Sequence, residues 1–362
     1  MKICYLGILG GGNISDTHAR AAAGVAAVRV SAVYGQNVER SAQLADRAGA
    51  VAYADLDGFL DHKPMDFVAI GSPSGFHAEQ AMAAISRGLH VIVEKPLDIS
   101  TARIDTLIAA ADRAGVRIGV FFQDRLKPDV LRMKEMVDSG HLGTPILASG
   151  RIKWHRPDEY FAGSRWRGTW ALDGGGALMN QGIHTIDVLS WMFGRVARVS
   201  AFAATRVHPI EVEDTLTATL EFENGALGGV EASTCAYPGY PRRVELTGRD
   251  GTLILEGDSL IATDLRDGSR RPTPPPTREE SDRASARLRQ QSAQSATVGD
   301  AAPHQRMIED FVNAIATNGT PACDAREGRR SVEIVEAIYR SARERRWVEV
   351  AERPTPSPER RV

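Results

Sequence analysis

Short apolar runs alternate with amphipathic segments over the first 122 residues of the chain. The apolar runs, which predict buried strands, cover residues 2–9, 28–34, 65–70, 89–93 and 117–122. Between them, Ala, Leu, Glu and Arg recur at helical spacing, and segments 39–48, 76–87 and 101–114 each end near a glycine that would close a helix. This alternation is typical of a doubly wound parallel sheet, so residues 1–122 are predicted to form an α/β domain.

The pattern changes beyond residue 122. An amphipathic helix at 127–139, a strand at 146–154 and a helix at 176–193 are followed by six strand-like runs between residues 199 and 263. Turn sequences such as Glu223-Asn224-Gly225 separate these runs. Consecutive strands without intervening helices predict a mostly antiparallel sheet. Residues 123–350, which finish with helices at 304–317 and 329–344, are therefore predicted to form a second, α+β domain.

Two segments have the composition of surface chain. Residues 267–300 are rich in Pro, Arg, Ser, Gln and Ala and poor in large apolar residues, which predicts a mobile insertion. A lid or a partner-binding arm is the alternative interpretation of this segment. Residues 351–362 are predicted to be a polar tail.

Charge and cysteine content narrow the class of protein. A net charge of -2 gives no electrostatic reason to expect nucleic acid or an anionic membrane as a partner. The three cysteines lie far apart without metal-type spacing, which favours a reducing compartment. No apolar run approaches the roughly 20 residues that span a bilayer, and the apolar start runs directly into glycines rather than a signal-peptide cleavage site. A cytoplasmic protein is predicted.

The first predicted strand leads into a glycine-rich loop. Gly10-Gly11-Gly12-Asn13-Ile14-Ser15 matches G-x-G-x-x-G except for the final serine, and it precedes a predicted helix. Gly10 permits a tight turn, and Gly12 lets the backbone approach a pyrophosphate. The N–H groups of the first helical turn, from Asn13 and Ile14, would then bind the phosphates. The alternative is a glycine turn without a ligand.

The second strand ends without the carboxylate that would bind an NAD ribose. The sequence there reads Tyr34-Gly35-Gln36-Asn37, so nothing in it repels a 2′-phosphate. Arg40 in the next helix could reach such a phosphate, or could simply be a solvated helix residue. Gly35 and Arg40 are predicted to contact the cofactor, and the pattern favours NADP over NAD.

Two later loops should reach the same carboxyl edge of the sheet. Ser72, Pro73 and His77 follow the third predicted strand and are expected to pack against a nicotinamide ribose, although His77 could equally be structural. Gln123 and Arg125 follow the fifth strand and are predicted to line the cleft.

Glu94-Lys95-Pro96, called here the E-K-P turn, closes the apolar run 89–93 and places an ammonium group at the ligand-binding edge. A lysine that is partly desolvated and beside a cationic nicotinamide has a depressed pKa, so it can exchange a hydroxyl proton during hydride transfer. The alternative is a surface lysine paired with Glu94, which would contribute little.

The helix at 176–193 carries three polar residues on one predicted face. Asn180, His184 and Asp187 stand at i, i+4 and i+7. His184 could hydrogen-bond the reacting hydroxyl while Asn180 orients the imidazole or the substrate; a polar face satisfied by local hydrogen bonds is the alternative. No second histidine has the spacing of a metal pair, so no metal is predicted. Asp173, before the helix, is expected in its N-cap region.

A cluster of aromatic and basic residues precedes that helix. Aromatic faces stack on sugar C–H surfaces and arginines donate to hydroxyls or phosphates, so the cluster is predicted to bind substrate, although some of its tryptophans could belong to the core. Its candidate contacts are Trp154, His155, Arg156, Tyr160 and Trp166.

Four motifs together resemble the glucose-fructose oxidoreductase / inositol dehydrogenase / MocA family. They are Gly10-x-Gly12-x-x-Ser15, Ser72-Pro73-x-x-x-His77, the E-K-P turn, and Gly174-Gly175-Gly176 with His184. The resemblance extends to about residue 350. It implies an N-terminal Rossmann domain, a C-terminal domain with a large open sheet, bound NAD(P), a sugar, sugar-derivative or cyclitol substrate, and a homodimer or homotetramer.

The resemblance also assigns catalytic positions. It places the family's lysine on Lys95 and its histidine on His184, whereas the family's aspartate falls on Asn180, where this chain departs from the pattern. Some sugar-nucleotide 3-dehydrogenases are similar at this position, so oxidation of a C3 hydroxyl is one expectation.

The sequence therefore predicts an NAD(P)-dependent oxidoreductase that transfers a hydride between the nicotinamide and a hydroxyl or keto carbon of a carbohydrate. The alternatives are a redox-assisted lyase or glycosidase that retains NAD, and a non-catalytic NAD(P) sensor. Predicted catalytic residues are Lys95, His184 and Asn180. Predicted cofactor contacts are Gly10, Gly12, Asn13, Ile14, Gly35, Arg40, Ser72, Pro73, His77, Glu94, Lys95 and Gln123. Predicted substrate contacts are Lys95, Arg125, Trp154, His155, Arg156, Tyr160, Trp166, Asn180 and His184.

Overall fold

The computed structural model describes residues 3–266, 268 and 300–350. The predicted insertion at 267–300 and the predicted tail at 351–362 thus lie almost wholly outside the described residues. Within the described part, no helix combines the length and the apolar character that crossing a membrane requires.

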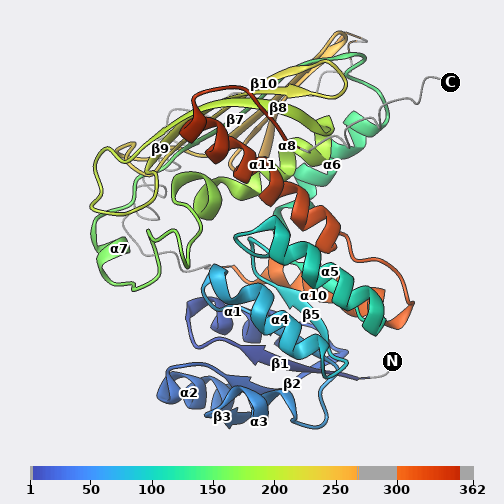
Figure 1. Ribbon diagram of the computed structural model, residues 1–362. Coiled ribbons are helices and arrows are strands. Elements are labelled where there is room, and N and C mark those ends of the chain that lie inside the picture. Colours follow the sequence, from blue (N-terminus) through green and yellow to red (C-terminus); the bar gives the residue numbers. More distant parts are fainter. Residues whose placement is uncertain (1–2, 267, 269–299, 351–362) are drawn as a thin grey trace, which may run out of the picture.

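The first half of the chain forms a parallel six-stranded sheet (Figure 1). Its spatial order is β3-β2-β1-β4-β5-β6, and every neighbouring pair is parallel, which confirms the predicted doubly wound fold. The order reverses between β1 and β4, so their carboxyl ends flank a crevice where such folds bind ligands. The strands are β1 (Cys4–Leu9), β2 (Val28–Tyr34), β3 (Val51–Tyr53), β4 (Phe67–Ile70), β5 (His90–Val93) and β6 (Ile118–Val120).

Helices connect these strands as the periodicity predicts. They are α1 (Asn13–Ala23), α2 (Val38–Ala48), α3 (Leu56–Leu60), α4 (His77–Ile85) and α5 (Thr101–Ala114), with a short 3-10 turn η1 (Ser74–Phe76) before α4. Gly49 and Gly115 close α2 and α5 in the left-handed conformation, at φ 66° and 67°. Strand β3 and helix α3 were not predicted, because they are only three and five residues long, too short for a periodic pattern to stand out.

The second half forms a mixed eight-stranded sheet in the order β13-β12-β11-β7-β10-β9-β8-β14. Only β7 and β10 pair in parallel, so the predicted mostly antiparallel sheet is confirmed. The strands are β7 (Pro145–Lys153), β8 (Val196–Ala204), β9 (Thr215–Phe222), β10 (Leu227–Ser233), β11 (Arg243–Gly248), β12 (Gly251–Glu256), β13 (Ser259–Leu265) and β14 (Val348–Glu349).

Helices cover one face of this second sheet. Helix α11 (Ala325–Glu344) contacts β8, α8 (Ile183–Phe193) contacts β7, and α6 (Pro128–Asp138) contacts β13 (Figure 1). Helix α10 (Ala302–Ala316) instead returns to the first half and packs against α1. Three shorter turns complete the described part: η2 (Gln123–Leu126), α7 (Glu159–Ala162) and the π-helical turn η3 (Ala177–Gly182).

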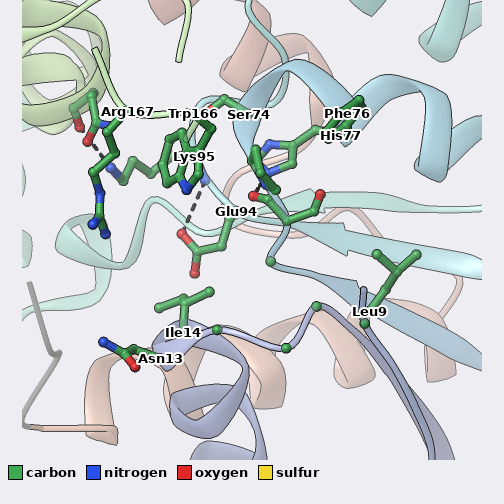
Figure 2. A pocket seen from close by; sticks show the side chains of 18 of the residues that line it. Leu9, Asn13, Ile14, Ser74, Phe76, His77, Glu94, Lys95, Trp166 and Arg167 are labelled. Carbon is green, nitrogen blue, oxygen red and sulfur yellow. Dashed lines mark hydrogen bonds between the residues drawn. The ribbon is translucent and has the colours of Figure 1, made fainter. Parts of the chain in front are cut away.

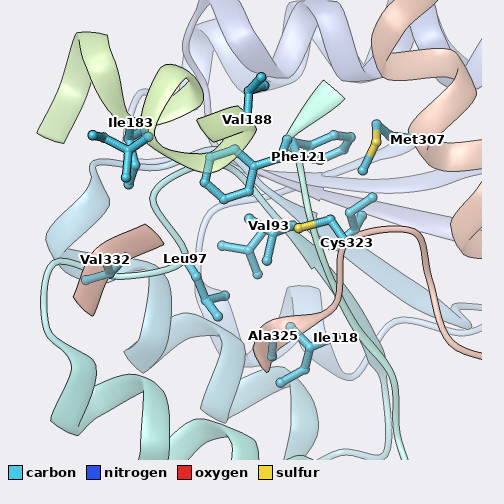
Figure 3. Packing of buried hydrophobic residues seen from close by; sticks show 14 of the residues in the cluster. Val93, Leu97, Ile118, Phe121, Ile183, Val188, Met307, Cys323, Ala325 and Val332 are labelled. Carbon is cyan, nitrogen blue, oxygen red and sulfur yellow. The ribbon is translucent and has the colours of Figure 1, made fainter. Parts of the chain in front are cut away.

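One continuous apolar core joins the two halves. Figure 3 shows Val93 and Phe121, from the β5–β6 region, meeting Val188 of α8, Met307 of α10 and Val332 of α11. Each of these five side chains is at most 1% exposed. Full burial of one such side chain stabilises the folded protein by about 1.5–3 kcal/mol. This packing therefore fixes the positions of the two halves relative to each other.

Candidate active site

A cavity of about 490 Å³ lies at the carboxyl ends of the first sheet and reaches the second half of the chain. In Figure 2, Lys95 and Arg167 lie on one side of it, with Asn13 and Ile14 across from them. The predicted site residues on its wall are Gly10, Gly12, Asn13, Ile14, Gly35, Ser72, Pro73, His77, Glu94, Lys95, Gln123, Trp154, Tyr160, Trp166, Asn180 and His184.

The glycine loop forms a cradle at the start of α1. Gly10 has φ +137°, and a Cβ there would stand 2.6 Å from Ser15 Oγ and 2.9 Å from the Gly71 carbonyl oxygen, so only glycine fits. A Cβ on Gly12 would meet no atom within 4 Å, so the space beside Gly12 is open. No side chain caps the helix that begins at Asn13. These residues fit a dinucleotide, because an uncapped helix N-terminus beside open space binds phosphate.

The described part of the cavity wall that follows β2, where an adenosine ribose was expected, contains no carboxylate. Tyr34, Gly35, Gln36 and Asn37 line it. Arg40, predicted to contact the cofactor, is not on this wall; it lines an adjoining hollow that shares Gly12 and Asn13 with the cavity. Its backbone N–H donates to Asn37 Oδ1 at 2.9 Å, as a first-turn residue does to an N-cap.

His77 links two loops instead of presenting a free nitrogen. Its Nδ1 lies 2.7 Å from the Pro96 carbonyl oxygen and its Nε2 lies 2.9 Å from that of Ser72. Ser72 Oγ is likewise occupied, because it donates to Gln80 Oε1 at 2.6 Å. Both ring nitrogens thus face carbonyl oxygens of the Ser72 loop and the E-K-P turn, which agrees with the structural alternative for His77. His77 also lies on the cavity wall, so its contact with the cofactor stays a prediction.

Glu94 forms a buried triad with two histidines. Glu94 Oε1 lies 3.0 Å from His18 Nε2 on α1 and 3.2 Å from His304 Nε2 on α10. Burial alone would raise the pKa of Glu94, but the hydrogen bonds from both imidazoles hold it well below its usual range. The carboxylate thus joins the two helices beneath the cavity. Sequence reasoning missed this triad, because His18 and His304 have no local spacing relationship.

The same triad bears on the expected absence of metal. Among residues 3–266, 268 and 300–350, His18, Glu94 and His304 are the one group whose side-chain ligand atoms converge, all within 4.8 Å of one another. All three side chains are already hydrogen-bonded within the triad. The absence of metal stays a prediction.

Lys95 reaches across the cavity to the second half of the chain. Its Nζ donates to the backbone carbonyl of Asn180 at 2.8 Å. Burial lowers the pKa of Lys95 below its ordinary value of 10.5, although the negative charges of Glu94, Asp173 and Asp124 oppose this effect. The ammonium group is therefore fixed in place, and its pKa is lowered.

The predicted polar face of the later helix is wrong in one respect. Asn180 lies in the π-helical turn η3, whose wider spacing changes the phase of the side chains before α8. Asn180 and His184 both line the cavity, but Asp187 points into the core. There it accepts hydrogen bonds of 2.8 and 2.7 Å from Arg125 and one of 3.0 Å from Ser331.

His184 is held as a neutral imidazole. Burial lowers its pKa to about 3, even though Asp124 lies close by, with Oδ2 3.8 Å from His184 Nδ1. The Asp124 carboxylate is itself paired with Lys127 and Arg242, which lower its pKa against the effect of burial. His184 therefore enters the cavity as an uncharged hydrogen-bonding group.

Asp173 has a different role from the predicted N-cap. Its carboxylate accepts from the Gly168 N–H at 2.9 Å and from the Asn180 side-chain amide. Burial raises the pKa of Asp173 to about 6. The start of the turn η3, which leads into α8, is instead held by Glu213, which accepts from the N–H groups of Gly176 and Leu178 at 3.0 and 2.8 Å. No sequence signal pointed to Glu213.

Aromatic side chains line the end of the cavity beyond Lys95. Trp154, Tyr160 and Trp166 are on its wall, together with Arg167, which was not predicted to bind substrate. The Arg167 guanidinium stacks 4.4 Å from the Tyr160 ring centroid and 5.2 Å from that of Trp166. Its adjacency to Trp166 in the sequence is the signal that could have identified it.

Three predicted substrate contacts are corrected, because Arg125, His155 and Arg156 are not on the cavity wall. Arg125 is 2% exposed and its guanidinium is taken up by Asp187 and Glu327. Arg156 donates to Gln181 Oε1 at 2.8 Å. The His155 backbone bridges to Cys235, and its ring packs edge-on against Tyr237. Their neighbours in sequence reach the cavity instead: Gln123 does so with a buried Oε1 that has no partner among the described residues.

The parallel sheet, the glycine cradle and the lysine at the strand ends define a nicotinamide-dinucleotide oxidoreductase. Residues 5–122 match the family model described as "Oxidoreductase family, NAD-binding Rossmann fold", and residues 130–254 match "GFO/IDH/MocA C-terminal domain". The chain belongs to the GFO/IDH/MocA family. It is an NAD(P)-dependent dehydrogenase or reductase that acts on CH–OH groups.

Relatives that are named for their activities agree with this class. D-apiose dehydrogenase of Paraburkholderia graminis is 30% identical over 305 residues, which are 82% of this chain and 76% of the relative. The WlbA dehydrogenase from Bordetella pertussis, solved with NADH and UDP-GlcNAcA, has a TM-score of 0.85 at 28% identity and covers 97% of this chain and 99% of its own. Levoglucosan dehydrogenase, solved with NADH and L-sorbose, has a TM-score of 0.83 at 25% identity, with 97% and 100% covered.

Proposed function

We propose that Lys95 is the acid/base group of this dehydrogenase and that its substrate is a sugar, sugar derivative or cyclitol. The observation that carries the proposal is the position of Lys95 Nζ. It lies on the cavity wall at the strand ends, bonded to Asn180, with a pKa that burial lowers. A lysine in this setting can take a proton from a hydroxyl near neutral pH.

Different residues of the cavity have different roles in this proposal. The loop from Gly10 to Ile14 would hold the dinucleotide phosphates, with Gln123 at the nicotinamide end. The bound cofactor supplies the hydride chemistry. Lys95 removes the hydroxyl proton as the C–H bond gives up its hydride, and it returns the proton in the reverse direction. His184, being neutral, holds the same hydroxyl by a hydrogen bond, and Asn180 fixes the lysine through its carbonyl.

The carbohydrate assignment rests on the far end of the cavity. Trp154, Tyr160 and Trp166 present aromatic faces that stack on sugar C–H surfaces. The Arg167 guanidinium adds hydrogen-bond donors beside them. The relatives include apiose and levoglucosan dehydrogenases, which supports the same substrate class.

A panel of sugars, polyols and sugar nucleotides tests this function, with nicotinamide absorbance followed in the presence of NAD or NADP. Reduction of the cofactor by at least one C–OH substrate is the expected result. Conversion of a sugar without net change in absorbance would favour a redox-assisted lyase or glycosidase. Binding of cofactor without turnover of any sugar would favour a sensor.

NADP is the proposed preferred cofactor. No carboxylate occurs among residues 34–37 on the cavity wall, and Arg40 lies in the adjoining hollow beside Gly12. A guanidinium in that position can bind a ribose 2′-phosphate. A lower KM for NADP than for NAD is expected, and a strong preference for NAD would overturn this assignment.

A homodimer or homotetramer is proposed, with the open face of the second sheet as the interface. Leu147 and Leu227 are direct neighbours on β7 and β10, and they are 51% and 53% exposed, while Phe202 on β8 is 70% exposed. The helices cover the other face. Light scattering coupled to gel filtration should give a multiple of the 39.2 kDa chain, and Phe202→Glu should reduce it. A monomeric wild type would refute the proposal.

A further inference from the structure

We propose that Asp173 is a positioning residue that sets the charge and the place of Lys95, supplying a carboxylate that position 180 lacks. The inference rests on the proposed role of Lys95. It goes beyond that role, because Asp173 is not on the cavity wall and acts on Lys95 through Asn180 and through its own negative charge.

Two hydrogen bonds link Asp173 to Lys95 through Asn180. The Asp173 carboxylate accepts a hydrogen bond from the Asn180 side-chain amide, and the Asn180 backbone carbonyl accepts one of 2.8 Å from Lys95 Nζ. Asn180 Oδ1 is also occupied, by Gln181 Nε2 at 2.9 Å. Because both ends of its amide are engaged, Asn180 is a fixed intermediary, and its predicted role as a direct substrate contact is replaced by a supporting one.

The charge of Asp173 is poorly neutralised compared with the other acids near Lys95. Three carboxylates act on Lys95: Glu94, Asp173 and Asp124. Glu94 is bonded to two imidazoles, and Asp124 is paired with Lys127 and Arg242. Among the described residues, the hydrogen bonds to the Asp173 carboxylate come from two neutral groups, the Gly168 N–H and the Asn180 amide. Its field therefore acts on Lys95 with little local compensation.

The remaining charged and titratable groups around the pair are Arg167, His184 and Tyr339. Arg167 acts on both Lys95 and Asp173 and opposes the carboxylate. His184 is neutral, and burial raises the pKa of the Tyr339 hydroxyl well above its ordinary value, so neither changes charge near neutral pH. Between about pH 5 and 7, Asp173 changes charge, since its pKa is about 6, and so does Glu213, which is bonded to Tyr339 and whose pKa burial raises to about 7. Of these two carboxylates, Asp173 is the one among the largest electrostatic influences on Lys95.

The decisive variant is Asp173→Asn, which keeps the shape and removes the charge. The pKa of Lys95 should fall by about one pH unit or more, because the neighbouring anion that stabilises its ammonium is gone. Reductive methylation of the lysines with ¹³C-formaldehyde and NMR titration of the full chain measure this directly, with Lys95→Arg used to assign the signal. Asp173→Glu should restore most of the wild-type value.

Glu213→Gln is the matched control. Glu213 is also buried and holds the same helix, but it does not figure among the charges acting on Lys95. The control should leave the Lys95 titration unchanged. An unaltered pKa in Asp173→Asn, or an equal shift in Glu213→Gln, would overturn the proposal.

Wild-type protein gives a second measurement should Asp173→Asn fail to fold. The Lys95 signal should show an additional inflection near pH 6, where Asp173 ionises, and Glu213→Gln should retain it. A wild-type signal with no inflection below pH 7 would refute the proposal. These titrations do not depend on turnover, so failure of the catalytic role of Lys95 is detected separately, by activity that survives Lys95→Ala.

Discussion

The ammonium of Lys95 is bonded to the backbone carbonyl of Asn180 at 2.8 Å, which joins the end of β5 in the first sheet to the π-helical turn before α8 in the second half. Because the carbonyl belongs to the main chain, no side-chain substitution at position 180 removes this acceptor. The location of the lysine therefore depends on how the two halves pack, and its chemistry depends on the charges that packing brings near it.

Replacing Lys95 by alanine should lower turnover by roughly a hundredfold or more, because the proton acceptor of the reaction is lost. Binding of NADH or NADPH, followed by the quenching of protein fluorescence, should stay close to wild type. Lys95→Arg is a useful companion, since it keeps the positive charge but cannot release a proton near neutral pH. Wild-type turnover in Lys95→Ala would remove the lysine from the mechanism.

Loss of the Asp187 carboxylate should destabilise the fold by up to about 3–5 kcal/mol, because the buried Arg125 guanidinium loses both of its hydrogen bonds to Asp187 and keeps only Glu327 as a carboxylate partner. Urea unfolding monitored by circular dichroism measures the change. The exposed pair Arg326–Asp112, with side chains 60% and 56% exposed, provides the control, and Asp112→Ala should cost less than about 1 kcal/mol. Equal effects of the two variants would contradict the assignment of Arg125 to the core.

His184 should make the protein less stable as the pH falls. Its pKa is about 3 in the fold and about 6.5 in an unfolded chain. Between these values the unfolded chain binds the extra proton, so the contribution of His184 to stability is complete above about pH 6.5 and declines as the pH falls towards 3. His184→Gln should flatten the dependence of the urea midpoint on pH over that window. An unchanged slope in the variant would mean that His184 titrates normally.

The buried triad His18–Glu94–His304 should hold no metal. Elemental analysis of the purified protein is expected to find no stoichiometric zinc, iron or manganese, and prolonged treatment with a chelator should leave the melting temperature unchanged. The reason is that Glu94 already accepts hydrogen bonds from both imidazoles. One equivalent of metal that disappears in His304→Ala would reverse this prediction.

Arg40 should matter for NADP but not for NAD. Losing a charged hydrogen bond to the 2′-phosphate costs about 1.5–3 kcal/mol, so Arg40→Ala should raise the KM for NADP roughly tenfold or more and barely change that for NAD. Arg47 lines the same hollow but is bonded to Asp16 at 2.7 Å, which makes Arg47→Ala the matched control. An equal change for both cofactors in Arg40→Ala would argue against a phosphate contact.

Sequence patterns predicted the fold well where local signals are strong. Strands β2 and β9 and helix α5 have the predicted bounds, because apolar periodicity and closing glycines mark their ends. The predicted face of Asn180, His184 and Asp187 failed at Asp187, because this carboxylate is paired with Arg125 in the core, and a single sequence gives no sign of that partner. Arg125 was predicted to line the cleft because it closely follows Gln123, which does so. Its partner Asp187, which holds it in the core, is distant in sequence and gave no local signal.

The triad beneath the cavity has a consequence for dissecting this protein. Glu94 is a residue of the first sheet, yet one of its two imidazole partners comes from α10, near the other end of the chain. A fragment cut after residue 122 would leave this carboxylate short of a donor and would uncover Phe121, which packs against His304. The nucleotide-binding half is thus completed by sequence far downstream, and autonomous expression of that half should require α10 to be grafted back.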